Sequence, residues 1–257
     1  MCVRKYKDEV FKECVFPKLD SPYKEALEDA VKFILKKFSV QGIIVTGSII
    51  SGTHSKSSDL DIFAINNRYE RQRIQKYFNK IPCEIFISTS TIIKEEISEG
   101  TTSGNCTTAH MFSSGFTIYD QNHLVYKLKN KSKDLIARGP SNSKIIMQSL
   151  KYRVADSYEN AMDIKDSDPY MSIIILSNTI VEAVNYKLRE LGKWEPKHKD
   201  LLKELEKNDI NLFNLIKKFH EIDNFDDKFK ISQEIIDNTI KVNGFFEWES
   251  EIEIHKD

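Results

Sequence analysis

The sequence lacks the residue patterns that mark the commoner zinc and thiol sites of proteins. Its four cysteines, Cys2, Cys14, Cys83 and Cys106, form no C-x-x-C motif, and its six histidines form no H-E-x-x-H pattern. These spacings argue against a zinc site and against a cysteine–histidine nucleophile. We therefore expect the cysteines to be free thiols in a reducing compartment.

The sequence also lacks an excess of either charge and any long apolar segment. It has 38 basic and 39 acidic residues, and this balance argues against a broad electrostatic surface for nucleic acid. No run approaches the roughly 18 apolar residues of a membrane span, and residues 1–14 lack the apolar core of a signal peptide. We expect a cytoplasmic protein with no membrane partner, for which nucleic acid is a less favoured partner than a small molecule.

The two halves of the chain differ in the elements that their patterns predict. Short β-branched runs and helical periodicity alternate up to residue 138, whereas beyond Gly139-Pro140 we find helical patterns only. We predict strands at 42–46, 60–65, 83–88 and 116–119, helices at 21–38, 70–79, 92–99 and 124–137, and a loop at 101–108. In the second half we predict helices at 145–162, 168–191, 197–207, 210–219 and 225–242. The expected fold is α+β: a small mixed β-sheet flanked by helices in a domain 1–138, and a C-terminal helical bundle in a domain 139–257.

Three carboxylates stand at the starts of two predicted strands. Asp59 and Asp61 are two residues apart, so their side chains point to one face of the strand. Glu84 lies near the start of the next predicted strand, and it reaches the same place if the two strands are neighbours. Such carboxylates repel one another unless a cation binds them, and Mg²⁺ prefers oxygen ligands of this kind. Taken alone, the D-x-D pattern is more typical of a strand with one solvated face than of a metal site.

A glycine-serine turn follows the first predicted strand. Gly47 allows the backbone to approach a phosphate closely, and Ser48 begins the segment after it. Ser58 adds a hydroxyl immediately before the acid pair. Hydroxyl and backbone N–H groups at such a turn can bind phosphate oxygens. The turn has neither the G-K-[ST] of a Walker P-loop nor a Rossmann fingerprint, and an ordinary strand-to-helix turn is the simpler interpretation of it in isolation.

Together these motifs resemble the nucleotidyltransferase superfamily of the DNA polymerase β type. The resemblance covers residues 42–88: Gly47-Ser48, ten residues, Asp59-Leu60-Asp61 on a strand, and Glu84 on the next strand. Kanamycin and lincosamide nucleotidyltransferases and the MNT proteins of toxin–antitoxin pairs are members. The resemblance implies that Asp59 and Asp61 hold two Mg²⁺ ions, with Mn²⁺ as an alternative, and that Gly47, Ser48 and Ser58 bind the nucleotide. Glu84, where Asp is commoner, would be a third metal ligand or the general base.

The helical half resembles, more loosely, the C-terminal domains of antibiotic nucleotidyltransferases, which supply part of the acceptor and nucleotide site. That resemblance suggests Lys199 as a phosphate contact, Glu182 as an alternative base and Trp194 as a stacking surface. Each residue also has a structural interpretation: a solvated lysine, an exposed glutamate and a core tryptophan. Arg153 and Asp156, three residues apart on a predicted helix, suit a surface ion pair.

The expected function is transfer of a nucleoside monophosphate from an NTP, with ATP favoured, to a hydroxyl of a small acceptor such as an aminoglycoside or lincosamide. One alternative is a toxin- or antitoxin-type nucleotidyltransferase that acts on tRNA or on a protein. Another is a catalytically silent nucleotide-binding module, because motif residues do not guarantee turnover. The sequence leaves the acceptor and the oligomeric state open, a dimer included.

Overall fold

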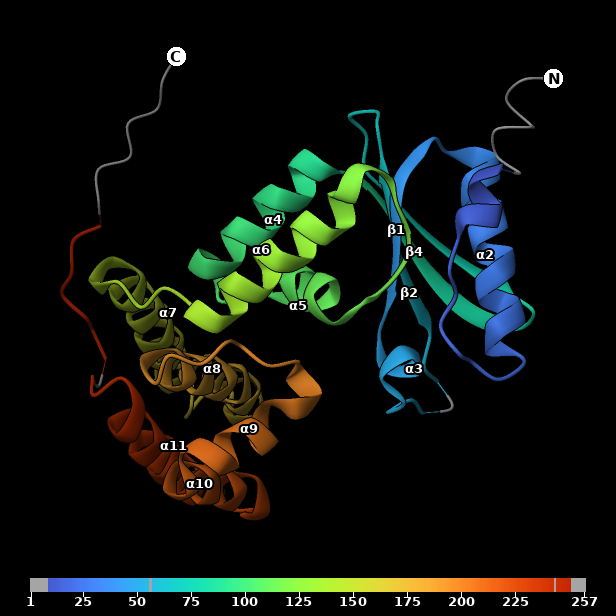
Figure 1. Cartoon of the computed structure of the whole chain (residues 1–257). Coiled ribbons are helices and arrows are strands. Elements are labelled where there is room, and N and C mark those ends of the chain that lie inside the picture. Colours follow the sequence, from blue (N-terminus) through green and yellow to red (C-terminus); the bar gives the residue numbers. More distant parts are fainter. Residues whose placement is uncertain (1–8, 56, 243, 251–257) are drawn as a thin grey trace. The chain divides into compact units, whose positions relative to one another are not determined.

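The computed structural model describes residues 9–55, 57–242 and 244–250 (Figure 1). The chain divides into two compact units, which are described separately. The sheet unit is Met1–Thr101 with Cys106–Arg138, and the helical unit is Thr102–Asn105 with Gly139–Asp257. Within the described residues, no helix is both long and apolar enough to cross a membrane.

The sheet unit is built on five strands that pair in a mixed arrangement. Their spatial order is β3-β4-β2-β1-β5. β2 and β4 are parallel, and the other neighbouring pairs are antiparallel. The strands are β1 (Val40–Thr46), β2 (Leu60–Asn66), β3 (Gln72–Phe78), β4 (Ile81–Thr89) and β5 (Phe116–Asp120). This mixed sheet, together with the helical unit, confirms the predicted α+β fold class.

Helices cover both faces of the sheet (Figure 1). α2 (Tyr23–Lys37) buries an apolar stripe that includes Leu27 and Ile34 in the core formed with Ile62 and Ile85. On the other face lie α4 (Ser90–Ser103), α5 (Thr107–Ser114) and α6 (Leu124–Arg138), and the short α3 (Ser48–Ser51) follows β1. A 3₁₀ turn, η1 (Gln121–His123), precedes α6. Because β1, β2 and β4 are covered on both sides, they are almost continuously apolar apart from the polar residues at their ends.

Among its described residues, the helical unit contains the five α-helices that the sequence predicts, with a 3₁₀ turn between the second and the third. They are α7 (Lys144–Asp163), α8 (Pro169–Glu190), η2 (His198–Asp200), α9 (Leu201–Asn208), α10 (Ile210–Glu221) and α11 (Phe225–Thr239). Asp168 caps α8 by accepting from Met171 N, and Pro169 occupies the first helical position. The buried core includes Leu176 and Phe219.

Two sequence predictions in the sheet unit are wrong. Residues 70–79, predicted as a helix, contain the edge strand β3, which is exposed along most of its length and therefore shows no alternation of apolar and polar residues. A two-residue turn of Asn79 and Lys80, with φ of 46° and 66°, links β3 to β4. The loop predicted at 101–108 is also shorter than expected, because α4 continues to Ser103 and α5 begins at Thr107.

Candidate active site

Three carboxylates converge at one end of the parallel strand pair. Asp59 directly precedes β2, Asp61 lies in β2, and Glu84 is the register partner of Asp61 in β4. One oxygen of each carboxylate lies within 4.8 Å of one oxygen of each of the others. The two aspartates are half-buried, and Glu84 is buried. The neighbouring position of β2 and β4, which the sequence analysis could only assume, is what brings Glu84 to the aspartate pair.

The edge strand β3 adds two residues that the sequence analysis missed. Arg73 Nε donates to Glu84 Oε1, and Gln75 Nε2 donates to the same oxygen at 3.1 Å. The Arg73 guanidinium also lies 5.4 Å from the centre of the Phe86 ring. The hydrogen bond and the negative charge of Glu84, with smaller effects of Asp61 and Asp59, raise the pKa of Arg73 further above its usual value. Arg73 therefore stays cationic beside the acid cluster.

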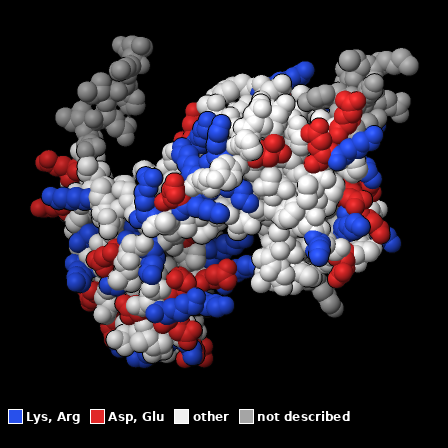
Figure 2. Space-filling view, viewed as in Figure 1, with Lys and Arg blue, Asp and Glu red and all other residues white. Residues whose placement is uncertain are grey.

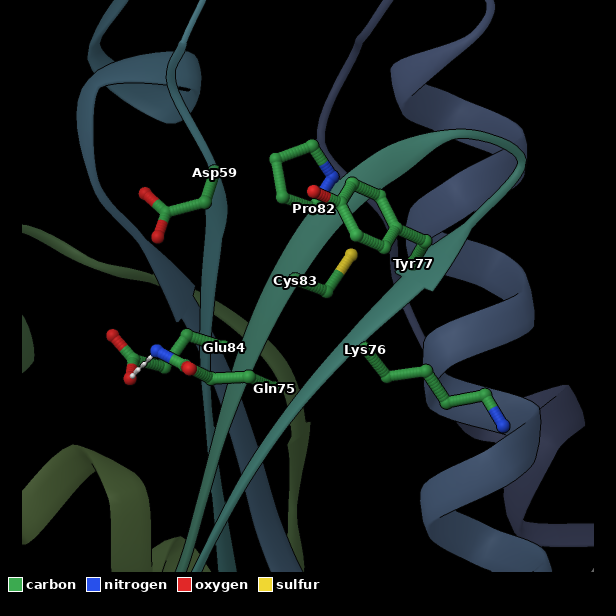
Figure 3. A pocket seen from close by; sticks show the side chains of 7 residues that line it. All are labelled: Asp59, Gln75, Lys76, Tyr77, Pro82, Cys83 and Glu84. Atoms are coloured by element: carbon green, nitrogen blue, oxygen red, sulfur yellow. Dashed lines mark hydrogen bonds between the residues drawn. The ribbon is translucent and has the colours of Figure 1, made fainter.

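A cleft of about 260 Å³ opens beside the cluster (Figure 3). Its lining residues are Asp59, Gln75, Lys76, Tyr77, Pro82, Cys83 and Glu84. The Lys76 side chain points away from the acids, and its amine lies 5.1 Å from the centre of the Phe33 ring. Burial, and secondarily the charge of Asp59, raise the pKa of Cys83 to about 12. Cys83 is therefore a protonated thiol at neutral pH and does not supply a thiolate nucleophile.

The predicted glycine-serine turn lies beside the same acids. Gly47 has a φ of 95°, and a Cβ at this position would lie only 2.6 Å from Asp61 Oδ2. Ser48 Oγ donates to Ser58 Oγ at 2.8 Å, and Ser55 N donates to the same Ser58 oxygen at 2.9 Å. The turn therefore places the Ser48 and Ser58 hydroxyls near the carboxylates and brings the Gly47 backbone close to Asp61. The three predicted nucleotide-binding residues of the sheet unit belong to this one turn region.

The remaining candidates lie in the helical unit, and their roles stay predictions. Lys199 is exposed in η2, Glu182 is exposed on α8, and Trp194 is half-buried after α8. Arg153 and Asp156 are both exposed on α7, where Asp156 Oδ2 accepts from the Asn160 side chain at 3.3 Å.

Comparisons with known proteins agree with this geometry. Residues 26–98, which contain the turn and all three acids, match the sequence model of the nucleotidyltransferase domain. One solved structure with a similar fold is a nucleotidyltransferase-like protein from Exiguobacterium sibiricum 255-15. The similarity has a TM-score of 0.56 at 11% identity, and it covers 84% of this chain and 73% of that chain. A search of curated proteins gave no match. Residues 26–98 thus carry a nucleotidyltransferase domain, and the similar solved structure supports the fold of most of the chain.

Proposed function

We propose that the protein is a Mg²⁺-dependent nucleotidyltransferase that transfers a nucleoside monophosphate from an NTP to an acceptor hydroxyl. The observation that carries the proposal is the convergence of Asp59, Asp61 and Glu84 beside the Gly47-Ser48 turn. In the reaction, an acceptor oxygen forms a bond to the α-phosphorus, the bond to the bridging oxygen breaks, and pyrophosphate leaves. The acceptor hydroxyl also loses its proton.

The donor set fits a hard divalent cation. All three groups of the cluster are carboxylates, and oxygen ligands are typical of Mg²⁺ or Mn²⁺ sites and not of sites for softer metals. Three like charges within this distance repel one another, and a bound cation would relieve the repulsion. Asp59 and Asp61 would hold the metal, with Glu84 as the third ligand. A metal bound here would supply the Lewis acid that polarises the phosphoryl group.

The other residues bind and orient the nucleotide and the acceptor. Gly47 would bring the backbone close to the phosphates, and Ser58, whose oxygen accepts from Ser48, would offer its hydroxyl proton to a phosphate oxygen; Ser48 would donate to a phosphate once its hydroxyl turns away from Ser58. Glu84 has one oxygen engaged by β3, so its second oxygen is the one that can accept the proton of an acceptor hydroxyl if it acts as the general base. Lys199 and Glu182 of the helical unit remain candidates for a phosphate contact and an alternative base.

The charge around the cleft favours a cationic small molecule over RNA as the acceptor. Asp59 and Glu84 line the cleft, and the single lysine of its lining directs its amine elsewhere. An acidic cleft attracts an amine-bearing acceptor, such as an aminoglycoside, and repels the phosphodiester backbone of an RNA acceptor. We therefore place a small cationic acceptor ahead of tRNA or a protein. ATP stays the nucleotide donor that the sequence analysis favours.

The experiment is incubation of the protein with each α-labelled NTP, Mg²⁺, and a panel of antibiotics, tRNA and proteins. Transfer of label to an amine-bearing small molecule supports the proposal, whereas transfer to tRNA or protein selects the alternative acceptor class. Asp61→Asn keeps the side-chain shape and removes a charge that the metal needs. We expect transfer to fall by at least ~10³, the scale of losing a principal electrostatic stabiliser, with an unchanged circular dichroism spectrum. Wild-type turnover in Asp61→Asn would contradict a metal-dependent mechanism at this cluster.

A further inference from the structure

A basic side chain and an amide reach the acid cluster from the edge strand β3. Arg73 Nε and Gln75 Nε2 both donate to Oε1 of Glu84. The strand register explains this arrangement, because Gln75 is directly opposite Glu84 and Arg73 is directly opposite Phe86, so all four side chains share one face of the sheet. The Arg73 side chain is 63% exposed, whereas that of Glu84 is only 11% exposed. Arg73 thus extends from the solvent across Phe86 to a buried carboxylate.

The two donors restrict what Glu84 can do. Because both use Oε1, the second oxygen is the one left to meet a metal ion or an acceptor hydroxyl, and bidentate metal binding would require breaking both hydrogen bonds. Gln75 supplies a neutral donor and Arg73 a cationic one. A charge-assisted hydrogen bond from an arginine strongly restricts the orientation of the carboxylate that accepts it. The pair therefore fixes the direction in which Glu84 presents its second oxygen.

The charge of Arg73 has a separate effect. The three carboxylates carry three negative charges, and Arg73 offsets one of them. A bare divalent ion is repelled by Arg73, whereas a metal–NTP complex is a net anion and is attracted by it. The same residue thus weakens binding of the free metal and strengthens binding of the metal–nucleotide complex.

We propose that Arg73 is a positioning residue that orients Glu84 and makes the site select the metal–NTP complex over the free metal ion. The proposal rests on the proposed function, since it assumes that the acid cluster holds a metal. It assigns this role to Arg73 and not to Gln75 of the same strand. Gln75 shares the hydrogen bond but not the charge.

The test compares two affinities in the full-length protein, those for Mn²⁺ alone and for Mn²⁺ with a non-hydrolysable NTP analogue, both followed by electron paramagnetic resonance of Mn²⁺. For Arg73→Gln we expect Mn²⁺ alone to bind about 5–20-fold more tightly, the scale of one charge acting on a divalent ion a few ångström away in water-like surroundings. The Mn²⁺–NTP complex should bind several-fold more weakly in the same variant. A purely structural role would not move the two affinities in opposite directions.

Two further variants separate charge from geometry. Arg73→Lys keeps the charge but loses the planar fork, so we expect both affinities to stay near wild type while kcat for transfer falls. Arg68→Gln removes one positive charge from the connection after β2. Arg68 is about 20 Å from Asp61 along the chain, because an extended strand rises about 3.3 Å per residue. At that distance salt screens the charge, so we expect both affinities to stay unchanged.

The outcomes are distinguishable. If wild-type protein binds neither Mn²⁺ nor the Mn²⁺–NTP complex, the proposed function itself fails. If wild type binds both, the inference is overturned when Arg73→Gln leaves the two affinities unchanged, weakens both together, or matches the effect of Arg68→Gln. Should Arg73→Gln fail to fold, Arg73→Lys decides, because unchanged kcat in that variant contradicts the positioning role.

Discussion

Gly47 connects one backbone dihedral angle to the position of a proposed metal ligand. Its φ of 95° is in the left-handed half of the map, where a side chain is strained. A Cβ would also lie 2.6 Å from Asp61 Oδ2, so any other residue must displace that carboxylate. Gly52 is a second glycine with positive φ in the same turn region, but its φ of 74° and ψ of 15° are in the αL region and no atom lies within 4 Å of its potential Cβ.

We predict that Gly47→Ala abolishes Mn²⁺ binding and lowers the transfer rate by at least ~10². A displacement of the Asp61 carboxylate by about 1 Å is enough for such a loss, because the reacting groups must be held in a precise geometry. Gly52→Ala should carry only the αL backbone cost, roughly 1 kcal/mol in unfolding free energy, with Mn²⁺ affinity retained; Gly47→Ala should cost more, because a φ of 95° with a ψ of -176° is essentially confined to glycine. Thermal melting and Mn²⁺ titration of the two variants provide the measurement. Equal metal affinities in both would show that Asp61 does not depend on the space at Gly47.

The sequence predicts the local part of this site and misses the part that depends on tertiary pairing. Asp59 and Asp61 could be placed together because alternation along a strand is a local rule. Glu84 required the assumption that β2 and β4 are neighbours, which the structure confirms. Arg73 and Gln75 could not be predicted as part of the site, because the predicted helix over 70–79 would not place them opposite Glu84.

At the scale of elements, β3 shows why the edge of a sheet is hard to predict. An edge strand with both faces largely exposed has no apolar face to reveal its period of two. Its turn is equally inconspicuous. A two-residue hairpin with positive φ at both positions is typical of Asn-Gly, yet the second position here is Lys80, with a φ of 66°.

We predict that Lys80→Gly stabilises the sheet unit by about 0.5–1 kcal/mol, because glycine removes the side-chain strain at positive φ and gives up part of that gain as unfolded-state entropy. Lys80→Ala is the control, since it deletes the long side chain and keeps the strained backbone. Urea unfolding of the full-length variants measures the difference. A destabilised Lys80→Gly protein would mean that the lysine side chain contributes more than its backbone costs.

At the scale of the whole molecule, four residues in the middle of the first half belong to the helical unit. Thr102–Asn105 group with residues after Gly139, although the sequence analysis placed them in domain 1–138. The fully buried Arg189 of α8 binds them: its guanidinium donates to Thr102 O at 2.7 Å and to Ser141 O at 2.6 Å. Glu195 N donates to Gly104 O at 3.2 Å. Nothing in the sequence around Arg189 predicts these long-range contacts. The helical half itself is predictable, because the sequence changes from mixed strand and helix patterns to helical patterns only.

We predict that Arg189→Leu lowers the unfolding free energy by about 3 kcal/mol, because it leaves the part-buried carbonyls of Thr102 and Ser141 without their donor and removes the largest counter-charge of the nearby Glu195. Arg189→Lys should cost less, since it keeps the charge but not the planar fork of donors. Denaturant unfolding measures both. A loss below about 1 kcal/mol in Arg189→Leu would show that the segment is held mainly by its other contacts.

The last prediction concerns what each unit contributes to the reaction. All three acids and the Gly47-Ser48 turn lie in the sheet unit, so a chain shortened to residues 1–138 keeps the proposed metal ligands and the proposed phosphate-binding turn. It loses Lys199, Glu182 and Trp194, and it also loses Arg189, the partner of Thr102.

We expect the shortened chain to bind Mg²⁺–NTP weakly and to transfer to no acceptor. In-line transfer requires an acceptor oxygen held about 3–3.5 Å from the α-phosphorus, and we propose that the helical unit helps to hold it. Binding must be measured on monodisperse protein, because Thr102 and Gly104 lose the partners that they have in the helical unit. Asp61→Asn in the same shortened chain is the control and should abolish the residual binding. If the well-folded shortened chain transferred at the full-length rate, the acceptor would be held by the sheet unit alone, and the helical unit would have to act in assembly or in binding a partner.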